Sequence, residues 1–231
     1  MAVKATVVLP TYCEAENLRT LLPVLLEAAP VEVIVVDDNS PDKTADVAQA
    51  IAEKTKRVHV LRRAGKLGLG SAYKTGMRAA LETGAEIVIT MDADWSHDPA
   101  RLPALLEAAS DRALAIGSRY VPGGGLGPWP LSRRVLSRTA QFFARTMLGF
   151  AAHDLTSGYR AYHQHVLIAV PPESIQSDGY SFLIEMAYRV RRAGFEIREV
   201  PIIFTDRRMG QSKISRREIF RAMRTLFRLR F

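Results

Sequence analysis

The chain has 231 residues, of which 48% are hydrophobic and 24% are charged, values typical of a globular domain with a buried core. Lysine and arginine together number 32 against 24 acidic residues, and the formal net charge of +8 favours an anionic partner: nucleotide phosphates, nucleic acid or an acidic membrane surface. The single cysteine, Cys13, excludes an internal disulfide, and the lack of a signal-peptide pattern or of any run near the roughly 20 apolar residues of a membrane span favours a cytoplasmic protein.

Short strands that alternate with helices are predicted for the first half of the chain. Apolar, β-branched runs predict strands at residues 6–9, 31–36, 58–61, 87–91 and 113–116. The spacing of leucines and alanines predicts helices at residues 14–28, 42–54, 71–82 and 100–109. This alternation predicts an α/β fold with a Rossmann-like, mostly parallel sheet and helices on both faces. No G-x-G-x-x-G sequence follows the first strand, so the usual signature of a dinucleotide oxidoreductase is absent.

The second half of the chain departs from this alternation. Glycines and prolines in residues 117–130 predict a loop, which we expect to order over a ligand. A helix with an apolar side and several arginines is predicted at residues 131–147, and residues 154–162 are expected to be turn-like and then extended. The last predicted elements are a helix at 182–193, a strand at 196–205, a loop at 206–213 and a basic helix from Ser215.

Two carboxylates follow the strand predicted at residues 87–91. Asp92 and Asp94 lie two residues apart, and Asp98 with Pro99 is expected to begin the next helix. Ligands bind at the carboxyl ends of strands in open α/β sheets, and hard oxygen donors at that place suit Mg²⁺ or Mn²⁺ carried in with phosphates. The alternative interpretation is that the two acids only cap a turn.

Other polar side chains follow neighbouring predicted strands at the same edge. They are Tyr12 and Glu14 after the first strand, Asp37 and Asp38 after the second, and Lys66 after the third. Each alone is more often a turn residue than a ligand, but four strands that end alike favour a shared site. A nucleotide needs a surface for its base, an acid for its ribose and cations for its diphosphate, roles that Tyr12, Asp38, the acid pair and Arg119 could fill.

Seven motifs, in this order, resemble the family 2 glycosyltransferases of the polyprenyl-phosphate (dolichol-phosphate) mannose synthase type. They are PTYCEAEN (10–17), VVDDNSPDKT (35–44), GLGSAYKTG (68–76), MDADWSHDP (91–99), GSRYVPGG (117–124), DLTSGYR (154–160) and DRRMGQSK (206–213). The resemblance covers about residues 5–225, and the last three motifs separate this subgroup from family 2 enzymes that build polysaccharides. It implies an A-type glycosyltransferase fold, GDP-mannose as donor, a polyprenyl (dolichyl) phosphate as acceptor, and Mg²⁺ or Mn²⁺ as cofactor.

The resemblance also implies roles for individual positions. The residues implied to bind the nucleotide sugar are Pro10, Tyr12, Glu14, Val36, Asp38, Asp92, Ala93, Asp94, Ser96, Arg207 and Lys213. The implied metal ligands are Asp92, Asp94 and Ser96, and the implied ligands of the acceptor phosphate are Arg119, Arg133 and Ser137. The implied catalytic residues are Asp92, Asp94, Arg119 and Arg133. The chain departs from the family pattern where Cys13 replaces an asparagine and Lys43 a glycine, and Ser96 is a shorter ligand than the glutamine of some relatives.

A single domain is expected over residues 1–231, with a nucleotide-binding half at about 1–118, an acceptor-binding half at 119–213 and a basic helix at 214–231. The helices from Leu131 and Ser215 carry apolar residues beside arginines, a pattern that indicates either packing on the core or a position in a membrane interface. We therefore hypothesise a peripheral enzyme on the cytoplasmic face of the membrane, with a membrane anchor subunit or a C-terminal anchor as a further partner.

The implied reaction is an inverting displacement at the anomeric carbon by a lipid phosphate oxygen. A phosphate monoester has a second pKa near 6 and needs no general base, which fits a sequence that offers no obvious histidine base. The five histidines show no recurring metal-ligand spacing, and Glu185 is expected to orient or pack rather than catalyse. One alternative is transfer of another sugar, such as glucose from UDP-glucose, to the same lipid class or to a soluble acceptor. A non-catalytic nucleic-acid-binding domain, suggested by the basic tail, leaves the acids at the strand ends unexplained.

Overall fold

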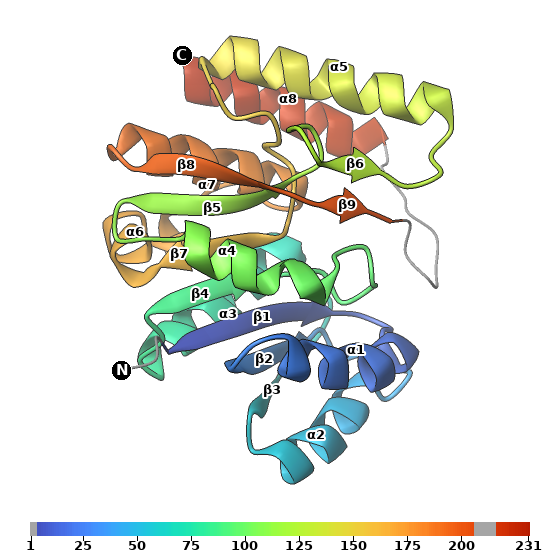
Figure 1. Ribbon diagram of the computed structural model, residues 1–231. Coiled ribbons are helices and arrows are strands. Elements are labelled where there is room, and N and C mark those ends of the chain that lie inside the picture. Colours follow the sequence, from blue (N-terminus) through green and yellow to red (C-terminus); the bar gives the residue numbers. More distant parts are fainter. Residues whose placement is uncertain (1–3, 206–215) are drawn as a thin grey trace.

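A computed structural model describes residues 4–205 and 216–231 of the chain and centres on a seven-stranded sheet (Figure 1). Its strands are β1 (Ala5–Thr11), β2 (Val31–Asp37), β3 (Val58–Arg62), β4 (Ile87–Thr90), β5 (Ala113–Ser118), β7 (Arg160–His163) and β8 (Glu196–Pro201). The strand order is β3-β2-β1-β4-β7-β5-β8, and a separate pair is formed by β6 (Gly125–Leu126) and β9 (Ile203–Phe204). All neighbours in the large sheet are parallel except β7, which is antiparallel to both β4 and β5.

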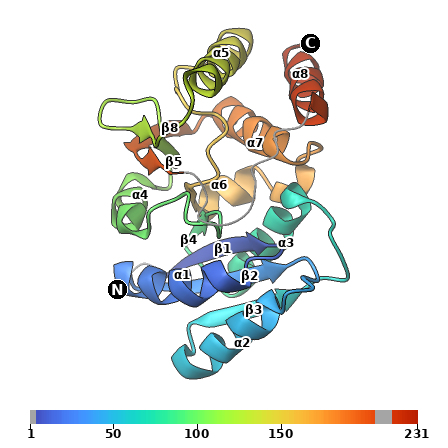
Figure 2. The same cartoon turned by 90° about the vertical axis from the view of Figure 1, so that its right-hand side faces the viewer.

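Helices cover both faces of this sheet, as Figure 2 shows. One face carries α1 (Ala15–Ala28), α2 (Thr44–Thr55) and α4 (Leu102–Ala108), with a 3₁₀ turn at Pro99–Arg101 before α4. The other face carries α3 (Leu69–Glu82), α6 (Gln164–Ala169) and α7 (Tyr180–Arg192), with a 3₁₀ turn at Pro172–Ser174 between α6 and α7. The prediction of a mostly parallel sheet with helices on both faces is therefore confirmed.

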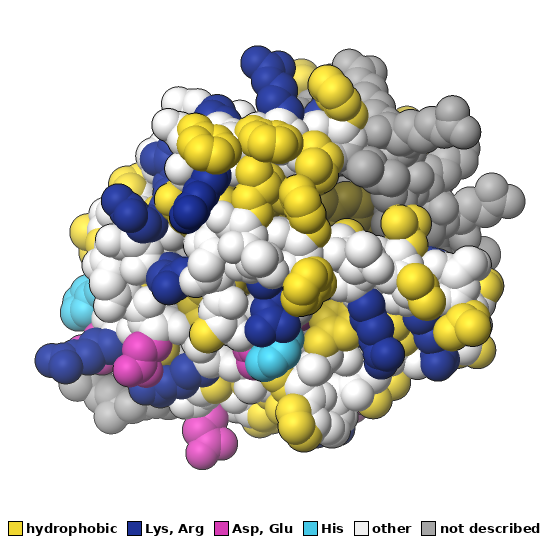
Figure 3. All heavy atoms as spheres, turned by 90° about the horizontal axis from the view of Figure 1, so that it is seen from above, with side chains coloured by type: hydrophobic (Ala, Val, Ile, Leu, Met, Phe, Trp, Pro, Cys, Tyr) yellow, Lys and Arg dark blue, Asp and Glu magenta, His cyan; other side chains and the backbone are white. Residues whose placement is uncertain are grey.

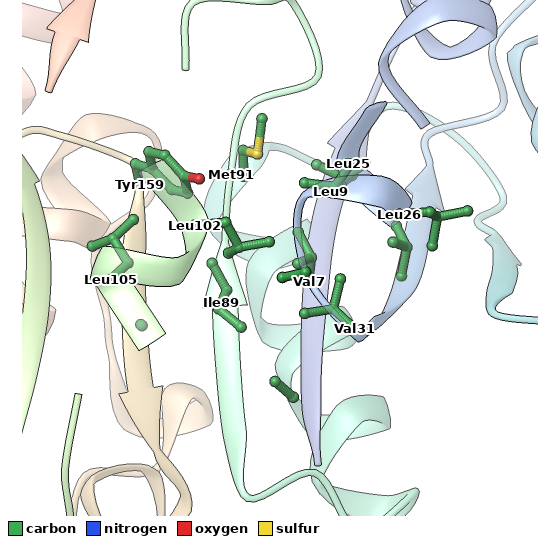
Figure 4. Packing of buried hydrophobic residues seen from close by; sticks show 14 of the residues in the cluster. Val7, Leu9, Leu25, Leu26, Val31, Ile89, Met91, Leu102, Leu105 and Tyr159 are labelled. Carbon is green, nitrogen blue, oxygen red and sulfur yellow. The ribbon is translucent and has the colours of Figure 1, made fainter. Parts of the chain in front are cut away.

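The central strands carry apolar side chains on both faces of the sheet, and helices cover these side chains on either face. On the first face, the fully buried Leu9 of β1 and Ile89 of β4 pack among side chains of α1 and α4 (Figure 4). Each such aliphatic side chain contributes about 1.5–3 kcal/mol on burial. On the other face, a Cβ atom at Gly76 of α3 would collide with Val8, so glycine lets this helix approach β1 closely.

The antiparallel strand β7 is the main difference from the predicted topology. Residues 154–162 were expected to become extended, and the extended part is β7, which separates β4 from β5. Because β7 runs against its neighbours, the residues that precede it lie at the carboxyl ends of β4 and β5. Two contacts show this: the Thr90 hydroxyl donates to the Gly158 carbonyl at 2.7 Å, and the Gly117 amide donates to the Tyr159 carbonyl at 2.8 Å.

Three further segments differ from the sequence-based expectation. The predicted strand at 196–205 is two strands, because Pro201 ends the pairing of β8 with β5 and Ile202 then accepts from the Gly125 amide at 2.9 Å. The segment predicted as a loop at 117–130 accordingly contains β6, which pairs with β9. The short helix α6 was not predicted, since six residues give too little of a helical period to recognise.

A third layer lies beyond β8, where α5 (Leu131–Leu148) and α8 (Arg216–Arg230) run side by side (Figures 1 and 2). Ala144 and Leu148 of α5 and Leu226 of α8 form an apolar cluster with residues of α7, which is how the two helices attach to the domain. Among the described residues, no helix has the length and apolar character needed to cross a bilayer.

Glu185 of α7 holds α8 in place from a position without solvent exposure. Its carboxylate accepts from the Arg189 guanidinium at 2.7 Å and the Ser177 hydroxyl at 2.6 Å, and it also pairs with Arg228 of α8. Burial alone would raise the pKa of Glu185, but the hydrogen bonds from Ser177, the Gln176 amide and Arg228 outweigh it and lower the pKa to about 2. The ionised form of Glu185 therefore stabilises the folded protein.

The free energy of unfolding should fall as pH decreases from about 4.5 towards 2, because a depressed carboxyl pKa makes the unfolded state bind the proton first. At pH 7, Glu185→Gln should lower stability by roughly 1–2 kcal/mol, a modest loss because both arginines are about a third exposed. Chemical denaturation at pH 7, 4 and 3 measures both effects. The control is Glu82→Gln, which removes the carboxylate from the exposed ion pair with Arg78. Equal losses of unfolding free energy in the two variants would contradict the stabilising role of the Glu185 carboxylate.

Candidate active site

The end of β4 fixes two carboxylates through contacts on either side. Asp92 accepts a hydrogen bond from the hydroxyl of Tyr73, a fully buried residue of α3, at 3.1 Å. Asp94 is buried and accepts from the Ser96 amide at 3.0 Å, which closes a tight turn after Ala93. As predicted, Asp98 begins the following helical turn, because its side chain accepts from the Ala100 amide at 2.9 Å.

Unpartnered polar atoms lie beside these carboxylates. The Ser96 hydroxyl and both ring nitrogens of His97 are buried without a hydrogen-bond partner among the described residues. Nε2 of His97 is 4.0 Å from Oδ2 of Asp92, too far for a hydrogen bond. Burial lowers the pKa of His97 to about 4, with Arg119 adding to this effect and Asp94 opposing it, so the ring is neutral near pH 7. Buried polar atoms without partners are rare and mark places where a water, ion or ligand belongs.

The oxygens of Asp92, Asp94 and Ser96 fit a hard divalent cation that keeps several ligands from water or substrate. Among the described residues, no group of three or more acidic, histidine or cysteine side chains is placed to hold a metal by itself. Mg²⁺ and Mn²⁺ accept such open sites, since they are commonly held by one or two carboxylates together with phosphate oxygens. The assignment of Asp92, Asp94 and Ser96 as metal ligands therefore stays a prediction, with which the chemistry of their oxygens is compatible.

The residues predicted for the nucleoside lie where β1, β2 and β3 end. The Lys66 ammonium stands 3.9 Å from the centre of the Tyr12 ring, so the loops after β1 and β3 meet, and the ring remains 39% exposed. Glu14 precedes α1, and its carboxylate accepts a hydrogen bond from the side-chain amide of Asn17 at 2.6 Å. Pro10 lies in β1, and Val36 of β2 is fully buried, so any contact of Val36 with a ligand falls to its main chain.

Asp37 and Asp38, adjacent in sequence, have different surroundings. Asp37 accepts from the Thr11 hydroxyl at 3.1 Å and the Ser40 amide at 2.9 Å, which makes it a turn residue. Asp38 is buried in an ion pair with Arg63, whose Nε lies 2.6 Å from Oδ1, and it accepts from the Leu67 amide at 3.1 Å. Asp38 thus fixes the loop after β3 beside the nucleoside region.

Arginines and aromatic rings form the other side of the site. Arg119, which follows β5, is buried and makes a two-point ion pair with the fully buried Asp154. The Arg133 guanidinium lies 3.6 Å from the centre of the Trp129 ring. Ser137 of α5 shares a 2.7 Å hydrogen bond with the Tyr120 hydroxyl, and these two hydroxyls join α5 to the residue after Arg119.

A row of rings connects the carboxylates with the arginines. The ring of His97 is stacked on Tyr159 at 5.1 Å and meets Phe204 at 5.5 Å. Phe204 in turn lies 5.3 Å from the Arg119 guanidinium and 5.7 Å from Trp129, which carries Arg133. The structure therefore brings the acid pair, Arg119 and Arg133 to one edge of the sheet.

Two predicted site residues cannot be placed, and several residues of this region were not predicted. Arg207 and Lys213 fall in the segment that is not described. Five further residues of this region were not predicted as site residues: Arg63, Tyr73, His97, Gln141 and Asp154. Tyr73, His97 and Asp154 lie inside motifs that carried the resemblance, so their position was a usable signal, whereas nothing local in the sequence distinguishes Arg63 or Gln141 from surface residues.

Sequence comparison matches residues 6–170 to a family described as glycosyl transferase family 2. The undecaprenyl-phosphate mannosyltransferase of Micrococcus luteus is 47% identical over 209 residues, which cover 90% of this chain and 86% of that protein. The polyprenol monophosphomannose synthase of Mycolicibacterium smegmatis is 45% identical over 223 residues, with 95% and 84% coverage.

Solved structures share the fold at lower identity. Glucosyl-3-phosphoglycerate synthase from Mycobacterium tuberculosis, in complex with Mn²⁺, UDP and glucosyl-3-phosphoglycerate, superposes with a TM-score of 0.71 at 20% identity, over 99% of this chain and 80% of that one. The mannosyltransferase PcManGT from Pyrobaculum calidifontis, in complex with GDP-Man and Mn²⁺, superposes with a TM-score of 0.63 at 19% identity, over 90% and 58%. At these identities the structural likeness concerns the fold alone.

Loss of the buried partner of Asp38 should be costly. Arg63→Met leaves an uncompensated carboxylate and should lower the free energy of unfolding by about 3 kcal/mol, and adding Asp38→Asn should recover part of this loss. Guanidinium denaturation of the single and double variants gives both values. Arg78→Met, which breaks an exposed ion pair, is the matched control. If Arg63→Met cost no more than this control, the pair would not have the structural role described.

Proposed function

The chain belongs to glycosyl transferase family 2, and from this membership we propose that it transfers mannose from GDP-mannose to a polyprenyl phosphate in a metal-dependent reaction. As an A-type glycosyltransferase, it agrees with the family and the fold that the sequence motifs indicated. The observation that carries the substrate proposal is the 47% identity, across 90% of the chain, to a protein named undecaprenyl-phosphate mannosyltransferase.

The donor is assigned to the edge formed by β1, β2 and β4. The exposed face of Tyr12 offers a flat surface to the base, and the loop fixed by Asp38 and Arg63 borders the same region. A divalent cation held by Asp92, Asp94 and Ser96 would stabilise the negative charge that grows on the departing nucleoside diphosphate. Tyr73 orients Asp92 for this role through its 3.1 Å hydrogen bond. Arg207 and Lys213 stay predicted partners of the diphosphate.

The acceptor phosphate is assigned to Arg119, Arg133 and Ser137. Its oxygen attacks the anomeric carbon with a lone pair as the bond from that carbon to the diphosphate oxygen breaks, with inversion of configuration. Because a phosphate monoester is largely a dianion at neutral pH, no general base is required, and the guanidinium groups only have to hold it. Nε and Nη2 of Arg119 are committed to Asp154 and Thr156, which, among the described residues, leaves the Nη1 edge for an anion.

A membrane surface is assigned as the place of reaction because the acceptor is a lipid. Apolar side chains of α5 are strongly exposed: Leu131 76%, Val135 55%, Leu136 58%, Phe142 69% and Phe143 41%. Figure 3, which looks onto α5 and α8, shows hydrophobic side chains on this surface with lysine and arginine side chains beside them. Apolar residues flanked by cations suit the anionic cytoplasmic face of a membrane. A membrane anchor subunit remains part of this proposal.

Asp94→Ala should abolish metal-dependent binding of GDP and GDP-mannose while leaving the fold intact, because it removes one of two carboxylate ligands. Calorimetric titration with and without Mg²⁺ or Mn²⁺ measures the binding, and circular dichroism checks the fold. Asp46→Ala, at an exposed position of α2, is the control. UDP-glucose is titrated in parallel, and tighter binding of UDP-glucose than of GDP-mannose would overturn the assignment of the sugar donor.

Replacing exposed apolar residues of α5 should weaken membrane binding. The double variant Leu136→Glu with Phe142→Glu is expected to reduce sedimentation with anionic vesicles at low salt by about tenfold, since it removes apolar contact and adds repulsion. Ile168→Glu on α6, a position 66% exposed, is the matched control and should bind as the wild type does. Equal sedimentation of all three proteins would refute the assignment of this surface.

A further inference from the structure

Gln141 is the one buried polar side chain that α5 turns toward the site among the described residues, and its burial is nearly complete at 5% exposure. It lies on the side of the helix away from the exposed Phe143, two residues further along. Both ends of its amide are used: Nε2 donates to the Thr156 hydroxyl at 2.6 Å and to Asp154 at 3.2 Å, and Oε1 accepts from the Leu155 amide at 3.0 Å. A single side chain of α5 therefore holds three consecutive residues of the segment before β7.

Arg119 uses the same acceptors. Its Nη2 donates to Oδ1 of Asp154 at 2.7 Å and to the Thr156 hydroxyl at 2.8 Å, the two atoms that also accept from Gln141. Its Nε and main-chain amide donate to Oδ2 of Asp154 at 2.6 and 3.1 Å. Because Gln141 and Arg119 share two acceptors, a shift of α5 changes the hydrogen bonds that fix the guanidinium plane.

The surroundings of Arg119 leave a defined place for a ligand. The guanidinium lies 5.3 Å from the centre of the Tyr120 ring and 5.3 Å from that of Phe204. A cavity of about 500 Å³ between α5 and residues 120–124 is lined by Arg119, Gln141, Arg138 and Arg145. The described lining of this cavity holds three arginines and no acidic side chain, so its charge favours an anion.

We infer that Gln141 is a positioning residue that fixes the phosphate-binding edge of Arg119 relative to α5. The inference rests on the proposed function, in which Arg119 holds the acceptor phosphate and α5 faces the membrane. In this arrangement the helix that meets the lipid surface and the arginine that meets the lipid phosphate are joined through one amide. Gln141 acts through Asp154 and Thr156 and does not itself contact the phosphate.

Gln141→Leu tests the inference because leucine keeps the bulk and removes the hydrogen bonds. Its dissociation constant for a short, water-soluble isoprenyl phosphate, measured by calorimetry without donor, should rise about tenfold, because the guanidinium of Arg119 loses part of the hydrogen-bond network that orients it. The KM for the same acceptor should rise in parallel, whereas kcat and the affinity for GDP-mannose should change less than about twofold. Thr139→Ala, at an exposed position of α5, is the control.

Thr156→Val gives an independent test should Gln141→Leu fold poorly, since it removes the hydroxyl that both donors share. It should weaken isoprenyl phosphate binding in the same direction, and the loss in the double variant should be smaller than the sum of the two single losses, because both changes remove the hydrogen bond between Gln141 and Thr156. Circular dichroism and thermal melting confirm the fold of each variant. Additive losses in the double variant would contradict the shared-acceptor mechanism.

Two results would overturn the inference: unchanged acceptor binding in Gln141→Leu, or an equal loss of donor and acceptor affinity, which is the signature of general unfolding. Failure of the proposed function gives a different pattern. If the wild type transfers no mannose but Gln141→Leu still weakens binding of isoprenyl phosphate, the positioning role stands and the assigned reaction does not.

Discussion

The antiparallel pairing of β7 between β4 and β5 is the constraint on which the site depends. A strand that runs against its neighbours begins where they end, so the segment 154–159 lies at the carboxyl edge beside the acid pair and Arg119. Arg160 secures this segment: fully buried, it donates to the carbonyls of Leu155, Ser157 and Leu183 at 2.7–2.8 Å. A parallel strand at this place would carry Asp154 to the opposite edge.

Buried carboxylates with arginine partners set the geometry of three different regions. Asp38 with Arg63 fixes the loop after β3, Asp154 with Arg119 fixes the acceptor side, and Glu185 with Arg189 and Arg228 fixes α8. Such pairs add little net stability, because desolvation offsets much of the attraction, but breaking one is costly. In this protein they specify where side chains point, and the apolar clusters on both faces of the sheet supply the stability.

The position of the acid pair after β4 could be predicted from the sequence because its signal is local. A short apolar strand followed directly by Asp92 and Asp94 places both acids at the edge where β1 and β2 also end, and parallel pairing needs no further information. Left-handed backbone at Cys13 (φ 61°) and Lys43 (φ 64°) also agrees with the motif positions, where the resembling family has asparagine and glycine. Arg63 and Gln141 escaped prediction because their partners lie 25 and 13 residues away.

The sequence by itself determined the α/β class, the positions of most strands and helices, the family and the carboxylates at the end of β4. These follow from hydrophobic periodicity and from residues that are close along the chain. Only the tertiary structure decided the direction of β7, the partner of each buried arginine, and the link from α5 through Gln141 to Arg119. The physical reason is that hydrogen bonds and ion pairs between distant segments depend on how the layers pack, and no local pattern of residues encodes that packing.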